Sequence, residues 1–164
     1  MSSTPISDAV EVANFTSTLS EWSDALLAAG FLEAIESGTS EDGKQQWLLR
    51  FRGEEKQFIA IWMTLRQRTV YVEIELMPSP EENVEEVLTI ALAKNFELFP
   101  LHIAIGPDNG LYLVMRFAVG EATSELFDEI SGAAIRYVDE LFPTLMARGY
   151  SSVYRRRSLP KTRR

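Results

Sequence analysis

The residues of this chain that could carry out chemistry are few and widely spaced. The chain of 164 residues has no cysteine and a single histidine, His102. Without cysteine it cannot form a thiolate nucleophile, a cysteine-ligated zinc site or an iron–sulfur cluster. A Ser-His-Asp triad would have to use His102, and no serine or carboxylate lies close to it in the sequence. On a regular strand His102 points away from the face that Leu101 and Ile103 bury, so we expect a partly exposed histidine without a catalytic role.

The turn at residues 106–110, Gly-Pro-Asp-Asn-Gly, carries oxygen atoms that could bind calcium. An EF-hand loop would continue with further oxygen ligands and a closing glutamate, whereas here Leu111, Leu113 and Met115 follow. This stretch therefore predicts a hairpin turn. The glycines form no phosphate-binding pattern ahead of a helix. We expect no catalytic residues, no metal and no cofactor, and a protein that is not an enzyme.

Charge divides the chain into an acidic body and a basic end. The last ten residues hold none of the 24 acidic residues and six of the 16 basic ones, which are Arg155, Arg156, Arg157, Lys161, Arg163 and Arg164. Residues 1–154 therefore carry 24 acidic against 10 basic residues, a net charge of −14. Such a body repels nucleic-acid phosphates and anionic lipids. We expect one domain over residues 1–154 and a disordered tail over 155–164 that could dock on an acidic surface or contact a membrane weakly.

Two further features concern location. No apolar run approaches the roughly 20 residues of a membrane span, and the first residues lack a charged region followed by a hydrophobic one. The absence of cysteine is compatible with a reducing compartment. We expect a cytoplasmic protein.

Apolar periodicity predicts three helices. The first carries Phe15, Leu19, Trp22 and Leu26 on one stripe and ends at Gly30. The second begins at a capping box, Ser79-Pro80-Glu81-Glu82, and its apolar stripe consists of Val84, Val87, Leu88, Ala91 and Leu92. The third begins near Thr123 and is interrupted near Pro143.

Alternating apolar residues predict five strands, over residues 46–52, 58–63, 70–76, 101–105 and 111–117. The second of these is apolar throughout, as in a central strand covered on both faces. Turn-forming residues over 37–45 predict a mobile loop. The fold class is therefore α+β: an antiparallel five-stranded sheet with helices on one face, in the order α-β-β-β-α-β-β-α.

Four short motifs carry a family resemblance: Leu92-Ala93-Lys94-Asn95, Asp108-Asn109-Gly110-Leu111-Tyr112, Val119-Gly120 and Leu141-Phe142-Pro143. Over residues 68–150 they resemble the YbjN family of bacterial proteins, which are loosely called sensory transduction regulators. The element order resembles the type III secretion chaperone-like fold. The resemblance implies a homodimeric, non-enzymatic protein that binds other proteins.

Strand pairing brings together a set of aromatic and acidic residues. A two-residue turn at Arg66-Gln67 would place Met63 opposite Val70 on the face that the helices cover. The other face would then place Trp62 opposite Tyr71, Ala60 opposite Glu73 and Phe58 opposite Glu75. A longer turn would change these partners but not the face of each residue. The candidate protein-interaction residues are therefore Phe58, Trp62, Tyr71, Glu73 and Glu75. Alternatively, residues 31–45 fold back over this face within one chain.

These observations favour a chaperone-like or regulatory protein-interaction module that acts as a homodimer and binds a further, unidentified protein. The alternative is a small-molecule-binding domain or an enzyme that uses carboxylates in a pocket between the last helix and the sheet. Glutamates at 81, 82, 85 and 86 stabilise the start of the second helix. They could also form an acidic patch for a partner's basic segment or for the basic tail.

Overall fold

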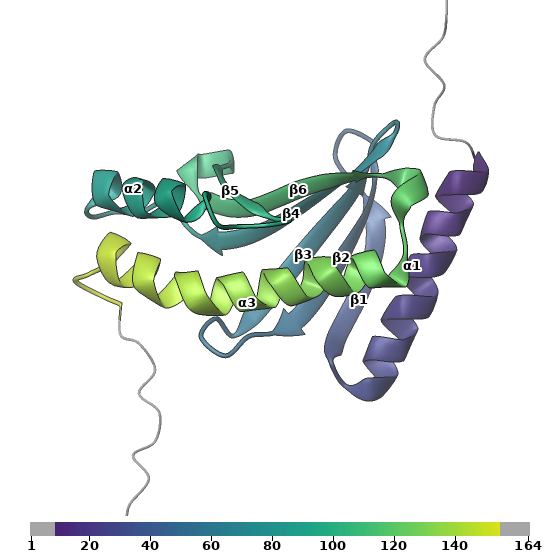
Figure 1. The fold of residues 1–164 in the computed structure, drawn as a ribbon, viewed down its shortest axis with the longest axis horizontal. Coiled ribbons are helices and arrows are strands. Elements are labelled where there is room, and N and C mark those ends of the chain that lie inside the picture. The colour runs from purple at the N-terminus through teal and green to yellow at the C-terminus, as the bar shows by residue number, and fades with distance from the viewer. Residues whose placement is uncertain (1–8, 155–164) are drawn as a thin grey trace, which may run out of the picture.

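A computed structural model describes residues 9–154, which form three α-helices and a six-stranded antiparallel sheet (Figure 1). In chain order the elements are α1 (Ala9–Ala29), β1 (Leu32–Thr39), β2 (Gln45–Arg52), β3 (Phe58–Leu65), β4 (Thr69–Met77), α2 (Val84–Lys94), β5 (His102–Ile105), β6 (Leu111–Ala118) and α3 (Ser124–Gly149). Short 3-10 turns lie at Pro107–Asn109 and Val119–Glu121. The strand order is β1-β2-β3-β4-β6-β5. The predicted α+β architecture with an antiparallel sheet is confirmed, but the sheet has six strands, not five.

The additional strand is β1, and the prediction of a mobile loop over 37–45 is wrong for residues 37–39, which belong to β1, and for Gln45, which begins β2. β1 pairs with β2 from Leu32 opposite Phe51 to Thr39 opposite Gln45. Only residues 40–44 make the turn, where the Ser40 N–H donates to the Lys44 carbonyl oxygen at 2.7 Å. Because residues 32–39 extend the sheet at its edge, they do not fold back over its face, and that alternative is also wrong.

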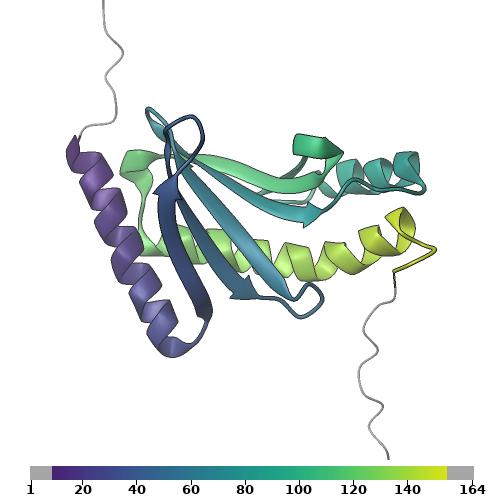
Figure 2. The same ribbon diagram turned by 180° about the vertical axis from the view of Figure 1, so that it is seen from behind.

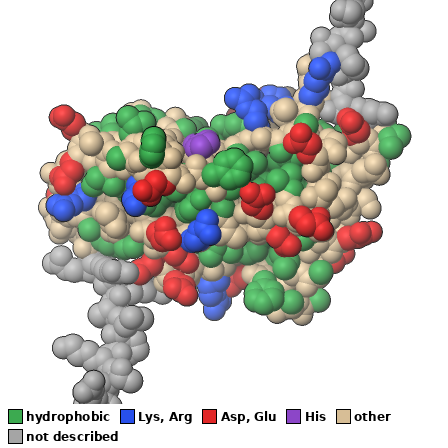
Figure 3. All heavy atoms as spheres, viewed as in Figure 1, with side chains coloured by type: hydrophobic (Ala, Val, Ile, Leu, Met, Phe, Trp, Pro, Cys, Tyr) green, Lys and Arg blue, Asp and Glu red, His purple; other side chains and the backbone are tan. Residues whose placement is uncertain are grey.

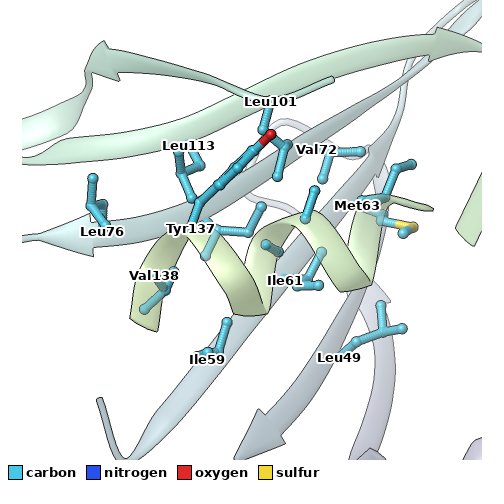
Figure 4. Packing of buried hydrophobic residues seen from close by; sticks show 14 of the residues in the cluster. Leu49, Ile59, Ile61, Met63, Val72, Leu76, Leu101, Leu113, Tyr137 and Val138 are labelled. Atoms are coloured by element: carbon cyan, nitrogen blue, oxygen red, sulfur yellow. The ribbon is translucent and has the colours of Figure 1, made fainter. Parts of the chain in front are cut away.

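The helices pack on one face of the sheet, and the view from behind shows no helix across the other face (Figure 2). An aromatic cluster joins the layers: the ring of Phe127 in α3 lies 6.0 Å from Phe15, 5.4 Å from Trp22 and 6.2 Å from Phe117 between centroids. Farther along α3, Tyr137 and Val138 face the inward side chains of the strands, among them Ile61 and Leu113 (Figure 4). This one-sided packing leaves the opposite face of the sheet free of helices.

The turn between β3 and β4 differs from the predicted one. The Arg66 N–H donates to the Thr69 carbonyl oxygen at 2.8 Å, so residues 67 and 68 form the turn. Trp62 therefore lies opposite Glu73 rather than Tyr71. The predicted partners are wrong by two residues, and a shift of two leaves every side chain on its predicted face. Phe58 and Trp62 are each 40% exposed, so β3 is not covered on both faces.

Helix α2 begins later than the capping box predicts. Its N-cap is Asn83, with φ of 50° and no side-chain cap hydrogen bond. The N–H groups of Glu81 and Glu82 donate instead to the Gly149 carbonyl oxygen, at 3.0 and 2.9 Å. A Cβ on Gly149 would lie only 2.9 Å from the Cβ of Pro80, so this approach requires glycine. The Gly149 carbonyl oxygen, at the end of α3, thus accepts hydrogen bonds from two N–H groups that would have lain in the first turn of α2 under the predicted capping box.

Helix α3 runs unbroken from Ser124 to Gly149, and the predicted interruption at Pro143 does not occur. Its start agrees with the prediction, because the Thr123 hydroxyl accepts from the Leu126 N–H at 3.1 Å. Pro143 removes one hydrogen bond from the helix. Pro143 and Leu145 are both buried, and this packing offsets the loss.

Two side chains hold the segment between α2 and β5. The Asn95 amide donates to the Ile103 carbonyl oxygen at 2.9 Å and accepts from the Ile103 N–H at 2.7 Å. The Tyr137 hydroxyl donates to the Phe99 carbonyl oxygen at 2.6 Å and accepts from the Phe99 N–H at 3.2 Å. Together they determine where β5 begins.

We predict that Asn95→Ala lowers the free energy of unfolding by about 1–3 kcal/mol, because it leaves two backbone groups of Ile103 without their partner. Urea denaturation followed by circular dichroism measures this. Thr89→Ala, on the exposed side of the same helix, is the matched control and should change stability by less than about 0.5 kcal/mol. Equal stabilities of the Asn95 variant and the wild type would show that the amide contributes nothing to the fold.

Candidate functional site

The five predicted interaction residues share the helix-free face of the sheet, here called the open face. Strand pairing puts Trp62 of β3 opposite Glu73 of β4, and Tyr71 and Glu75 lie two residues away on either side of Glu73. Phe58 lies four residues before Trp62 on the same strand, so it projects from the same face. The structure therefore brings together the aromatic and acidic side chains that the sequence singled out.

Arginines cover two of the aromatic rings. The Arg50 guanidinium carbon lies 5.3 Å from the centroid of Phe58, and that of Arg66 lies 4.7 Å from the centroid of Tyr71. Both distances are in the range of cation–π contacts. Arg116 opposite Tyr71 and Arg52 opposite Phe58 share this face, so the open face carries positive charge beside its aromatic and acidic side chains.

Trp62 has a different setting, between Leu48 of β2 and Glu73 of β4. A hollow of about 230 Å³ opens beside its indole, bounded also by Glu36 and Gly38. No atom lies within 4 Å of the place where a Cβ on Gly38 would be, so this side of the hollow is open. The open face thus offers an exposed aromatic anchor next to a recess.

Carboxylates dominate the end of the open face near Glu75. Burial, followed by the charges of Glu75, Asp108 and Glu73, raises the pKa of Tyr112. Lys56 donates to the backbone carbonyl oxygen of Glu75 at 2.8 Å, and its ammonium lies 5.8 Å from the ring centroid of Phe142 in α3. Burial lowers the pKa of Lys56, and the negative charge of Glu75 opposes that effect. The open face therefore has an acidic end beside the arginine-bearing aromatic rings.

A second apolar surface, which sequence reasoning missed, lies at α2 and β5. Its members are Leu92, Phe96, Phe99 and Ile105, which are 73%, 96%, 70% and 58% exposed. We call this set the α2–β5 apolar end. The predicted apolar stripe of α2 is wrong for Leu92 and for Val84, which is 46% exposed, because the fully buried residues of this helix are Val87 and Ala91. Phe96 and Phe99, which follow the end of α2 and flank Glu97 and Leu98, could have indicated this surface from the sequence.

At one end of α3, a surface groove of about 510 Å³ between this helix and β6 is lined by His102, Arg116 and Glu129 among others. Farther along α3, the space between the helix and the sheet is filled by apolar side chains (Figure 4). The buried polar side chains of residues 9–154 are Ser23, Thr64 and Ser131, and none is a carboxylate. No cluster of three or more histidine, aspartate or glutamate side chains in this range could hold a metal ion. His102 is exposed, between the buried residues Leu101 and Ile103, as predicted.

Hydrogen bonds and an ion pair join the residues at the end of α3 to those at the start of α2. We call the contact of Glu82 with Ser151 and Ser152 the latch. Glu82 accepts hydrogen bonds from the Ser151 hydroxyl and from the Ser152 N–H. Arg148 pairs with Glu86 at 3.4 Å, and Asn83 donates to the Arg148 carbonyl oxygen at 2.9 Å. Tyr154 then packs back on α3, with its ring 5.9 Å from that of Phe142 between centroids. The tail candidates themselves lie outside the described residues: Arg155, Arg156, Arg157, Lys161, Arg163 and Arg164.

Comparison with known proteins finds distant relatives, and no family model matches the chain. An uncharacterized protein of Mycobacterium leprae is 25% identical over 126 residues, which are 77% of this chain and 68% of that protein. An uncharacterized protein of Mycobacterium tuberculosis is 26% identical over 109 residues, which are 66% of this chain and 60% of that protein. The match thus spans less than two thirds of the tuberculosis protein's length.

Among solved structures, the heterodimeric complex ExoU-SpcU from the type III secretion system of Pseudomonas aeruginosa contains a similar chain. The match has a TM-score of 0.48 and 17% identity, and it covers 58% of this chain and 80% of that one. Among residues 9–154, none of the helices combines the length and apolar content that a membrane crossing needs.

The latch predicts a pH dependence. Hydrogen bonds from Ser151 and Ser152 lower the pKa of Glu82 from its usual value of 4.5. A lowered pKa means that the latch stabilises the fold above pH 4.5 and that this contribution is lost as the pH falls through the lowered value. We predict that Ser151→Ala moves the pKa of Glu82 upward toward 4.5, whereas Ser151→Thr, which keeps the hydroxyl, leaves it low. NMR titration of the Glu82 carboxyl group measures this, and identical titrations in the wild type and the alanine variant would contradict the latch.

Proposed function

We propose that this protein is a non-enzymatic protein-interaction module, chaperone-like or regulatory, which acts in the cytoplasm as a homodimer and binds another protein. The observation that carries the proposal is the open face, where Phe58 and Trp62 are each 40% exposed on a sheet that no helix covers on that side. Grouped aromatic side chains on a soluble domain usually mark an interface. Tryptophan, tyrosine and arginine, all present here, are the residues that dominate binding energy at protein interfaces.

The charge pattern of the open face supports contact between two copies. Arg50 of β2 and Arg66, which follows β3, lie over aromatic rings, and Glu73 and Glu75 lie on β4. In an isologous dimer the same surface meets itself across a two-fold axis. A two-fold axis through the open face would let the arginines of one copy approach the glutamates of the other. These ion pairs would attract the two copies and fix their relative position.

The chain offers two separate apolar surfaces, as a dimer that also binds another protein requires. The open face is one of them, and the α2–β5 apolar end is the other, with Phe96 at 96% exposure. We assign the open face to the second copy and the remaining apolar surface to the partner.

Membership in a YbjN-like, type III secretion chaperone-like group is part of this proposal. The motif residues have structural roles that support it. Asn95, at the end of the first motif, clamps Ile103 of β5. Asp108 and Asn109, in the second motif, adopt φ of 57° and 59° in the turn between β5 and β6. Both motifs thus determine how β5 and β6 pair.

We predict that the wild type sediments near 37 kDa, twice the 18.5 kDa of one chain, and that Trp62→Glu sediments near 18.5 kDa at micromolar concentration. A carboxylate at this position would be desolvated next to Glu73 in the dimer, which disfavours association. Sedimentation velocity measures the mass, and circular dichroism checks that the variant is folded.

Two matched variants complete the experiment. Ser20→Glu adds the same charge to an exposed position of α1 and should leave the dimer intact. Phe96→Glu tests the α2–β5 apolar end and should also leave it intact. A dimer that survives Trp62→Glu but dissociates with Phe96→Glu would show that the α2–β5 apolar end forms the dimer, and it would leave the open face for the partner. A wild type that is monomeric at micromolar concentration would overturn the homodimer.

A further inference from the structure

The described chain ends next to the acidic end of the open face. Tyr154 is its last residue, and the Tyr154 ring lies 5.9 Å from the ring of Phe142 between centroids. The Lys56 ammonium lies 5.8 Å from the same Phe142 centroid and donates to the Glu75 carbonyl oxygen at 2.8 Å. Two side chains, those of Phe142 and Lys56, therefore bridge Tyr154 and the strand that carries Glu75.

The chain after Tyr154 is long enough to reach across this end of the sheet. Residues 155–164, the basic tail, span up to roughly 33 Å when extended, at about 3.3 Å per residue. That reach is more than twice the path from Tyr154 through Phe142 and Lys56 to Glu75. Glu73 lies two residues before Glu75 on β4, so both carboxylates project from the same face. Both are within the reach of the basic tail.

The basic tail and the acidic end have opposite charge. Glu75 lies opposite Tyr112, and the charges of Glu75, Asp108 and Glu73 add to the effect of burial in raising the pKa of Tyr112. No ion pair within residues 9–154 uses any of these three carboxylates. Six of the ten tail residues are basic and none is acidic. The tail therefore supplies the cations that the acidic end lacks.

Acidic side chains elsewhere are less available. They are spread over the side of the molecule that carries the helices (Figure 3), so charge alone does not select a place for the tail. Those at the start of α2 already have partners. Glu82 accepts hydrogen bonds from Ser151 and Ser152, and Glu86 pairs with Arg148 at 3.4 Å. The acidic end of the open face is thus the better site for further cations.

The open face also offers an aromatic ring to a guanidinium group. The rings of Phe58 and Tyr71 each have an arginine of the chain itself over them. No cation–π contact within residues 9–154 uses Trp62, which is 40% exposed and lies opposite Glu73. Tryptophan is the strongest cation–π partner among the aromatic residues. An arginine over Trp62 would lie beside a carboxylate as well.

We propose that residues 155–164 bind across the acidic end of the open face of their own chain. Basic side chains of the tail pair with Glu73, Glu75 and Asp108, and one arginine lies over Trp62. The docking itself does not depend on the homodimer. Its consequence rests on the proposed function: Trp62 and Glu73 also belong to the surface that we assign to the second copy, so a docked tail competes with the dimer and regulates self-association.

A spin label on the tail tests the docking in the full chain. The chain has no cysteine, so Thr162→Cys creates a single attachment site and keeps all six basic residues. The nitroxide should lower the NMR intensities of the Glu73 and Glu75 amides at least twofold relative to the reduced label. Salt at about 1 M, where the screening length is about 3 Å, should restore them. Full intensity of both amides at low salt would overturn the docking.

Charge variants separate docking from mere proximity to Tyr154. Glu73→Gln combined with Glu75→Gln should abolish the broadening. Glu21→Gln combined with Glu85→Gln removes two charges from exposed positions of α1 and α2 and should leave it unchanged. Circular dichroism checks that both double variants are folded. Equal broadening in the two would overturn the proposed site, and broadening centred on the Glu85 amide would assign the tail to α2 instead.

Two further samples test the other occupants. In a mixture of spin-labelled chains without ¹⁵N and ¹⁵N-labelled chains without the spin label, broadening as strong as within one chain would assign the open face to the tail of a second copy and overturn the proposal. Dilution below the concentration at which the dimer dissociates should strengthen the broadening within one chain. If a protein that sediments as a dimer shows no such change, the competition is wrong. If it sediments as a monomer, the homodimer is wrong and the spin label still tests the docking.

Discussion

The rest of the structure depends on the packing of α3 across one face of the sheet. Its apolar side buries Phe127, Ile130, Val138 and Leu145 completely. Burial of each such side chain contributes roughly 1.5–3 kcal/mol, so this one helix supplies a large part of the driving force for folding. Because side chains alternate along a strand, apolar residues that face α3 require the remaining residues of the same strands to face away. The open face is the direct consequence of that constraint.

Polar groups on α3 also position segments that are distant in the sequence. Asp128 accepts from the indole N–H of Trp22 at 2.8 Å and so orients α1. Asp139 accepts from the N–H groups of Glu54 and Glu55, at 3.0 and 3.3 Å, and holds the turn between β2 and β3. Tyr137 binds the segment before β5, and the Gly149 carbonyl oxygen binds the segment before α2. The helix thus positions the segments that lead into β5 and α2.

The surfaces that remain differ in what they can bind. The open face is broad, and its aromatic rings lie beside both arginines and carboxylates, which suits a flat, self-complementary contact. The α2–β5 apolar end carries large exposed side chains, among them Phe96 at 96% exposure. A module with these two features can associate with itself and still hold a partner.

The sequence by itself determined the elements whose pattern is local. The apolar stripe at Phe15, Leu19 and Trp22 predicted α1 and its end at Gly30. The alternation of apolar residues predicted that Phe58, Trp62 and Tyr71 share one face of the sheet, because the face of a strand residue depends only on its spacing along the strand. Tertiary structure decided the rest. Pairing with β2 made a strand of residues 37–39, and the Gly149 carbonyl oxygen moved the start of α2 past its capping box. Packing of the buried Pro143 kept α3 unbroken from Ser124 to Gly149. Each outcome depends on hydrogen bonds or contacts between residues far apart in the chain, whose energies no local pattern contains.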